Sequence, residues 1–434
     1  APSATAPASR PRWKVKGKRW SSLGFWLPRA SVAVVGFVVS RPVRALAGVG
    51  EKHRASVTID PGRTRSGIPP SVATVDSIAV LPTHSMSNRF SAISLGLLAL
   101  LSAAGRPGAA ELLQATAGEQ GLYAVRTGEQ LIVRRIGSEG TSIDAPLSSD
   151  LYSLRPTTHG WVAAGHALTD TGDADLLLVQ QFEGQLEMLP LPDKGAGMLR
   201  GQPVVLVSDG SLAGLAWVEG DRQSDLQVWA ARWTGNEWGE TESVSGPGPG
   251  SQLALAGAVL EDGSWLLVWT GFDGEDDETL FSRKVQGIWS TPELVHADNQ
   301  VPDITPALVA LRDGAVAAWS WFDGSDYRIK TARFDGHDWT VNEAMGGKGS
   351  VYPRLVSTEL GAQLLFHSVS PETWTVVEVD AAGLLSRIST LPKSTRSRPL
   401  LLGPTSDEVR LAWPSETGMI DGASIRKRPW EPLR

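Results

Sequence analysis

Residues 305–339 read TPALVALRDGAVAAWSWFDGSDYRIKTARFDGHDW, and this stretch decides the fold. It holds an apolar run, a turn at Gly314, a second apolar run that ends in Trp319, an acidic turn, and an alternating run up to Phe334. Alternation with a period of two residues is typical of β-strands and not of helices. A second tight turn then leads to Trp339 and a more polar run. The stretch therefore predicts four short antiparallel strands in succession.

The same unit recurs along the chain. Residues 263–295, GSWLLVWTGFDGEDDETLFSRKVQGIWSTPELV, repeat it, and weaker copies begin near residues 122, 160, 361 and 409. Equivalent positions near residues 165, 217, 269, 319, 366 and 413 are 47 to 52 residues apart. A four-stranded unit with this period is typical of β-propeller blades. We therefore predict an all-β fold for residues 111–434, a seven-bladed β-propeller of four-stranded antiparallel blades. Six blades are the alternative, if the short first copy completes the last blade.

The two quoted stretches resemble the blade repeats of sialidase-like β-propellers. The resemblance is good over residues 200–434 and poor over 111–200, and it implies the fold alone, because many unrelated activities use this scaffold. The Asp box of the family, Ser/Thr-x-Asp-x-Gly-x-Thr-Trp, is not present in full, since residues 335–339 keep only a turn and a Trp. Sialidases also use three Arg and a Tyr nucleophile paired with Glu, and none of the four Tyr residues has a matching context. We therefore do not expect sialidase activity.

The N-terminal quarter has a different composition. Residues 1–85 hold thirteen Lys and Arg against three acidic residues, and we interpret them as unstructured or as sequence upstream of the natural protein. A basic arm for nucleic acid or membrane is the alternative. Residues 86–110 follow the pattern of a signal peptide, with Met86, Arg89, a short apolar run and small residues before Glu111. We expect synthesis from Met86, cleavage before Glu111 and export to the periplasm or the medium.

The remaining domain is strongly acidic. Residues 111–434 carry 25 Lys and Arg against 44 Asp and Glu, a net charge of −19. Such a surface repels nucleic acid and anionic lipid and favours basic partners or cations. The chain has no Cys, so its core alone must hold the domain together. We expect a monomer without a membrane span and without contact to nucleic acid.

The acidic residues concentrate in the predicted turns between second and third strands. In a propeller these turns and the connections between blades emerge on one face. The candidate ligand-binding residues in and beside them are Asp273, Asp276, Asp277, Trp321, Phe322, Asp323 and Asp326. Carboxylates beside aromatic rings suit a saccharide, because rings stack on the sugar and acids accept its hydroxyls, and the same face would attract a basic protein segment. The structural alternative is that Asp-Gly is simply the preferred chemistry of a tight turn.

Metal and catalytic motifs are sparse. Asp170, Asp173 and Asp175 have the alternating spacing of oxygen ligands that Ca²⁺ favours, and we expect no other cofactor. The five His residues of the acidic domain have no metal-binding spacing, and no nucleophile motif stands out. Trp217, Trp269, Trp319 and Trp413 recur at one repeat position, which predicts that they pack between blades.

These observations predict an exported, non-enzymatic propeller that binds a protein or glycan through its acidic loop face. The alternative is a divergent glycoside hydrolase or lyase that uses Asp or Glu from the blade turns as acid and base.

Overall fold

The computed structural model describes most of the acidic domain. The described residues are 111–115, 122–127, 130–135, 141–143, 151–168, 174–193, 199–222, 225–297, 301–392, 399–405, 408–414 and 420–426. All of them belong to the second of two compact units, Leu81–Arg434. Residues 1–110, with the predicted signal peptide and its upstream segment, lie outside the described residues.

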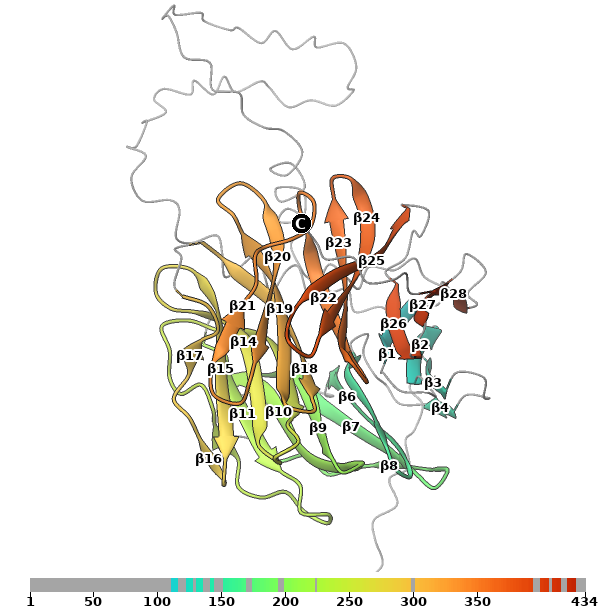
Figure 1. Ribbon diagram of the computed structural model, residues 1–434. Helices are drawn as coiled ribbons and strands as arrows, with labels where there is room; N and C mark the ends of the chain where they lie inside the picture. The colour runs from blue at the N-terminus through green and yellow to red at the C-terminus, as the bar shows by residue number, and fades with distance from the viewer. Residues whose placement is uncertain are drawn as a thin grey trace, which may run out of the picture. The chain divides into compact units, whose positions relative to one another are not determined.

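The described residues form strands and turns without a helix, in successive antiparallel sheets (Figure 1). The first sheet consists of β1 (Glu111–Ala115), β2 (Leu122–Thr127), β3 (Gln130–Arg135) and β4 (Thr141–Ile143). The second consists of β5 (Leu151–Thr157), β6 (Gly160–Leu168), β7 (Ala174–Phe182) and β8 (Gln185–Met188).

The three central sheets are the best matches to the sequence repeat. They consist of β9 (Leu199–Ser208), β10 (Ser211–Gly220), β11 (Gln227–Arg232) and β12 (Glu242–Ser243); of β13 (Gln252–Val259), β14 (Trp265–Phe272), β15 (Asp277–Val285), β16 (Ile288–Trp289) and β17 (Glu293–Leu294); and of β18 (Asp303–Leu311), β19 (Gly314–Phe322), β20 (Tyr327–Phe334) and β21 (Trp339–Val341).

Two sheets follow. One consists of β22 (Val351–Thr358), β23 (Gly361–Val369), β24 (Glu372–Asp380) and β25 (Leu385–Pro392), and the other of the three strands β26 (Leu400–Thr405), β27 (Glu408–Pro414) and β28 (Ile420–Arg426). Strands are ordered within each sheet as they are in the chain, except that β16 and β17 both pair with β15. The first strand of each sheet lies beside the first strand of the next, and β26 lies beside β1. Consecutive meander sheets that meet along their first strands are the arrangement of a β-propeller.

The recurring Trp residues lie in the core between sheets, as predicted. Trp217, Trp269 and Trp319 are fully buried, and each packs with apolar residues of the preceding sheet. Trp413 is half-buried and packs against the apolar cluster between the sheets β22–β25 and β26–β28. Each of the three buried indoles has a buried acceptor for its N–H: Glu219 at 2.8 Å, Gln252 at 2.6 Å and Asp303 at 3.0 Å. The recurring Trp is therefore a structural residue of the blades.

The outer strands differ from the sequence prediction. Trp238 does not begin a fourth strand; it forms an isolated bridge with Trp233, and β12 comes four residues later. In the next sheet the outer edge is split into β16 and β17, with Pro292 between them. Proline has no N–H to donate to a ladder, so it interrupts the strand. The described part of the chain contains no helix long and apolar enough to cross a membrane.

Candidate functional site

A four-residue acidic turn, Asp-Gly-x-Asp, occurs three times, at residues 273–276, 323–326 and 335–338. In each copy one carboxylate oxygen of the first Asp accepts the backbone N–H groups of the third and fourth residues, at 2.7 to 3.1 Å. The glycines have φ between +87° and +121°, a conformation that side chains disfavour. Asp273 and Asp323, two predicted ligand-binding residues, therefore hold their own turns, as the structural alternative expected.

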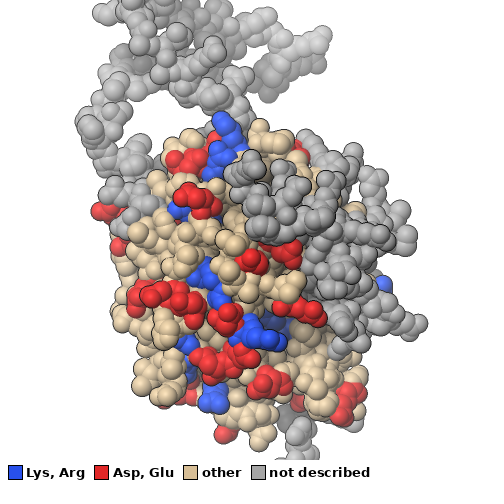
Figure 2. Space-filling model, viewed as in Figure 1, with Lys and Arg blue, Asp and Glu red and all other residues tan. Residues whose placement is uncertain are grey.

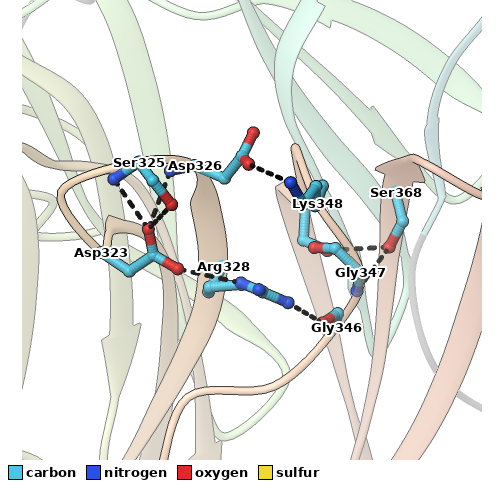
Figure 3. A network of polar contacts seen from close by, with 9 residues as sticks. Asp323, Ser325, Asp326, Arg328, Gly346, Gly347, Lys348 and Ser368 are labelled. Atoms are coloured by element: carbon cyan, nitrogen blue, oxygen red, sulfur yellow. Dashed lines mark hydrogen bonds and ion pairs between the residues drawn. The ribbon is translucent and has the colours of Figure 1, made fainter.

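The turn between β19 and β20 is also tied to a neighbouring segment (Figure 3). The second carboxylate oxygen of Asp323 accepts Nε of Arg328 at 3.2 Å, and Nη1 of Arg328 donates to the carbonyl of Gly346 at 2.6 Å. Asp326 lies 3.7 Å from the exposed ammonium of Lys348. Hydrogen bonds, first of all that from the Asp326 backbone, hold the pKa of Asp323 well below its usual range. These contacts occupy the carboxylates of this turn.

Basic residues interrupt the acidic surface. Lys and Arg side chains lie between the Asp and Glu side chains across the face shown in Figure 2. Arg328 and Lys348 are two of the residues that bring positive charge next to acidic turns. The net charge of the domain therefore does not translate into a uniformly acidic face.

Two adjacent sheets present the same three backbone positions toward the sheet that follows. In the sheet β9–β12 these positions hold Val218, Leu226 and Val228, which we call the apolar wall. In the sheet β13–β17 they hold Thr270, Asp277 and Thr279, which we call the polar wall. Both sets are fixed by register, because Val218 pairs with Val228 one residue after Trp217, and Thr270 pairs with Thr279 one residue after Trp269.

Both walls face the next sheet. The apolar wall is buried in one cluster with Leu267 and Trp269 of the sheet β13–β17. Phe281 lies on the same face of β15 as the polar wall, two positions after Thr279, and packs with Trp319 and Phe334 of the sheet β18–β21. We call the contact region between the polar wall and that sheet the polar seam.

The polar wall is buried and incompletely hydrogen-bonded. Asp277 and Thr279 are 4% and 1% exposed. Oδ2 of Asp277 and Oγ1 of Thr279 have no hydrogen-bond partner among the described residues, whereas Oγ1 of Thr270 accepts the Thr305 N–H at 3.2 Å. Burial, together with the charge of Asp273, raises the pKa of Asp277 to about 6.

The opposite side of the polar seam carries charged and aromatic residues. Lys330 is the cross-strand partner of Trp319, at the position where β15 has Leu280. Its Nζ lies 2.9 Å from Nε2 of His296 and 4.3 Å from the ring centre of Trp321. Burial lowers the pKa of Lys330 against the opposing effect of nearby carboxylates, the first of them Asp303. Nε1 of Trp321 is buried without a partner in the part of the chain that the structure describes.

Two aromatic rings lie at the β19–β20 turn, on the face of the sheet opposite Trp319 and Lys330. Phe322 and Tyr327 are cross-strand partners at the β19–β20 turn, with ring centres 5.3 Å apart, and both are half-buried. Burial, and then the charges of Asp277 and Asp303, raise the pKa of Tyr327 to about 12. The phenol is therefore neutral and lies within the electrostatic reach of both carboxylates.

The structure thus divides the predicted ligand-binding residues. Asp277 and Trp321 face the polar seam, whereas Phe322 pairs with Tyr327 on the opposite face of the sheet β18–β21. Asp273, Asp323 and Asp326 belong to the turns, where Asp276 is also buried.

The calcium hypothesis concerns a different turn. Asp170 and Asp173 lie outside the described residues. The Asp175 carboxylate accepts the Leu176 N–H at 2.8 Å and lies 3.6 Å from Arg200. Within the described ranges no three His, Asp or Glu side chains are placed to hold a metal ion. Calcium at the Asp170 turn stays a prediction.

Sequence reasoning missed Thr279, His296, Asp303 and Lys330. The available signal was a comparison of the repeats position by position. Asp277 and Thr279 replace Leu226 and Val228, and Lys330 replaces Leu280. A polar residue in a repeat position that is apolar in the neighbouring copy marks a departure from the common core.

Comparisons with known proteins find distant structural likeness and no sequence match. No protein family model matches the chain, and no curated protein matches its sequence. The chain is similar in structure to a prolyl endopeptidase, with 14% identity and a TM-score of 0.45 over 79% of this chain, and it spans about half, 53%, of that protein. It is also similar to the polysaccharide lyase Uly1, with 9% identity and a TM-score of 0.49 over 75% of this chain and 90% of that one.

A third similar structure is the β-propeller domain of the Trilobed protease from Pyrococcus furiosus. It shares 10% identity at a TM-score of 0.46, over 73% of this chain and 95% of that one. At these identities and TM-scores the likeness carries no conclusion about activity or partners. The resemblance to sialidase-like repeats stays a hypothesis at the level of the family.

Proposed function

We propose that this chain is an exported, non-enzymatic β-propeller that binds a protein or glycan partner at the polar seam and the turns around it. One observation carries the proposal: the polar wall replaces core residues by Asp277 and Thr279 in an otherwise repeated scaffold. Buried polar side chains that lack hydrogen-bond partners lower the free energy of unfolding relative to apolar ones, so the stability of the fold does not explain their presence. A ligand that hydrogen-bonds to these residues would explain it.

Seven blades in a closed ring are part of the proposal. The described strands fall into seven sheets, and β26 lies beside β1 without pairing to it. A closed ring leaves no long unprotected edge. Because the chain has no Cys, one cysteine placed in β1 and one in β26 form a unique pair. Intramolecular cross-linking of this pair by a short thiol-reactive bis-maleimide supports the ring, and cross-linking only between molecules contradicts it.

Export rests on residues 86–110. The N-terminal sequence of the protein isolated from its host should begin at or near Glu111. An N-terminus within residues 1–85 contradicts this part of the proposal.

The binding function is tested by presenting the purified protein to a glycan array and to a panel of basic peptides, with chromogenic glycosides assayed in parallel. The proposal predicts binding to one of the two ligand classes without turnover. Loss of that binding in Asp277→Asn, with retention in Asp335→Asn, assigns it to the polar seam. The second variant removes a carboxylate from a turn of the same kind between β20 and β21.

One observation favours the enzymatic alternative. Asp277 has a raised pKa of about 6, and buried carboxyl groups with raised pKa values are common among general acids. Cleavage of a glycoside or of a uronic-acid polysaccharide that disappears in Asp277→Asn would replace the binding function by a glycoside hydrolase or lyase.

A further inference from the structure

We infer that the polar seam is a subsite for the hydroxyl groups of a saccharide, with Asp277, Thr279 and Trp321 as its hydrogen-bonding residues. The inference rests on the proposed binding function and names its ligand class. The three residues come from two facing sheets, since Asp277 and Thr279 lie on β15 and Trp321 lies on β19.

Oδ2 of Asp277, Oγ1 of Thr279 and Nε1 of Trp321 are all buried and lack a partner in the described ranges. Buried polar groups in folded proteins are almost always hydrogen-bonded. These three atoms come from two facing sheets, and a polar guest would supply each of them with a partner.

A carboxylate oxygen accepts a hydrogen bond, an indole N–H donates one, and a threonine hydroxyl does both. A hydroxyl group of the ligand can donate to Asp277, accept from Trp321 and do either with Thr279. A saccharide carries several hydroxyls, so it offers both donors and acceptors to these groups.

Two other guests, an ammonium group and a divalent metal ion, do not fit these groups. An ammonium group only donates, so it leaves the Trp321 N–H unsatisfied, and Lys330 already places a cation beside the Trp321 ring. A divalent metal ion needs several oxygen or nitrogen ligands, and no group of three His, Asp or Glu residues in the described part of the chain is arranged to supply them. A neutral hydroxyl avoids both difficulties.

The repeat itself supplies the variant that tests the inference. Leu226 and Val228 fill the matching positions of the apolar wall and are buried there. Asp277→Leu/Thr279→Val therefore installs the side chains that occupy the same positions in the sheet β9–β12. A matched control, Thr358→Val/Glu359→Leu, makes the same two kinds of change at the β22–β23 turn, where Glu359 is exposed.

The experiment is saturation-transfer difference NMR on the purified full chain. The probes are the methyl glycosides of D-glucose, D-galactose and D-mannose. Nα-acetyl-L-lysine methylamide, which keeps its side-chain ammonium group, is the cationic probe. We expect at least one glycoside to bind, the Kd to rise about tenfold or more in Asp277→Leu/Thr279→Val, and the control variant to bind like the wild type. Asp277→Asn, which keeps the shape of the side chain, should weaken the same signal, and circular dichroism verifies the fold of every variant.

The outcomes separate the two proposals. Glycoside binding that persists in the double variant overturns the seam as the site and leaves the binding function standing. Binding of the lysine probe alone, lost in the double variant, overturns the hydroxyl assignment. Failure of every probe here, of the glycan array and of the basic peptides overturns the binding function itself.

Discussion

The apolar wall and the polar wall occupy the same positions in adjacent sheets but continue the fold in different ways. Val218, Leu226 and Val228 join a cluster that includes Trp265, Leu267 and Trp269. Their counterparts in the next sheet leave a carboxylate oxygen and a hydroxyl buried without partners in the described residues. The backbone pairing is regular in both sheets at these positions. The two walls therefore differ in their side chains and not in their backbone pairing. The apolar wall shows which side chains stabilise the fold at these positions, and the polar wall departs from them.

Moving the acid from one wall to the other should have the largest effect. Leu226→Asp should lower the free energy of unfolding by about 5 kcal/mol at pH 7, because it removes a buried apolar side chain and places an unpaired carboxylate in an apolar cluster. Urea unfolding followed by Trp fluorescence measures this change. A decrease below about 1 kcal/mol would mean that the apolar wall tolerates a charge. The polar residues of the other wall would then be no evidence for a ligand.

The recurring Trp is common to both sheets and should be structural in both. Trp269→Ala should lower the free energy of unfolding by about 3–5 kcal/mol, because truncation leaves a large cavity and removes a hydrogen bond to Gln252. The half-buried Trp289 of the outer strand is the matched control, and Trp289→Ala should have a clearly smaller effect. Chemical denaturation of the two variants decides. Equal losses would contradict the assignment of the inner position to the core.

The pH dependence of stability should expose the acid in the polar wall. The folded-state pKa of Asp277 is raised to about 6. The folded state therefore binds a proton that the unfolded state has released, and stability falls as the pH rises from about 4 to above 6. Relative to Asp277→Asn, the wild type should lose about 3 kcal/mol across this window.

A control resolves the second cause of that pKa shift. Asp273→Asn removes the neighbouring negative charge and should move the transition to lower pH without abolishing it, because burial is the larger cause. Unfolding curves between pH 4 and 8 for the three proteins give the answer. A wild-type curve parallel to that of Asp277→Asn would contradict a buried, titrating Asp277.

The turns should respond least. Asp323→Ala removes the side-chain acceptor of the turn and should lower Tm by about 2 °C, whereas Asp326→Asn, which alters a long surface ion pair, should leave Tm unchanged within error. Differential scanning calorimetry compares the two. A larger effect for Asp326 would show that its contact with Lys348 and not the turn geometry stabilises this loop.

Much of the fold could be predicted from the sequence because its signals are local. Period-two alternation, Asp-Gly turns and the spacing of Trp217, Trp269 and Trp319 identify the strands, and the repeat identifies the blade. The outer strands were less predictable. They are short, and local features such as Pro292 decide where they pair.

The candidate site was only partly predictable because it depends on register. Residues 276–278 are three consecutive acids, and the sequence does not say which of them faces the next sheet. The pairing of Phe272 with Asp277 decides this, because alternate residues of β15 face opposite sides. Lys330 and His296 meet through the packing of a strand against a connection 34 residues away, which no local pattern encodes.

The central claim is that Asp277 and Thr279 are present for a ligand and not for the fold. Equilibrium urea unfolding of Asp277→Leu/Thr279→Val without added ligand, beside the wild type at pH 7, tests it most directly. The account predicts that the double variant is more stable, by about 1–3 kcal/mol, because it replaces incompletely bonded buried polar groups by the side chains of the apolar wall. A double variant that is less stable than the wild type would show that the polar wall belongs to the core, and would contradict the account.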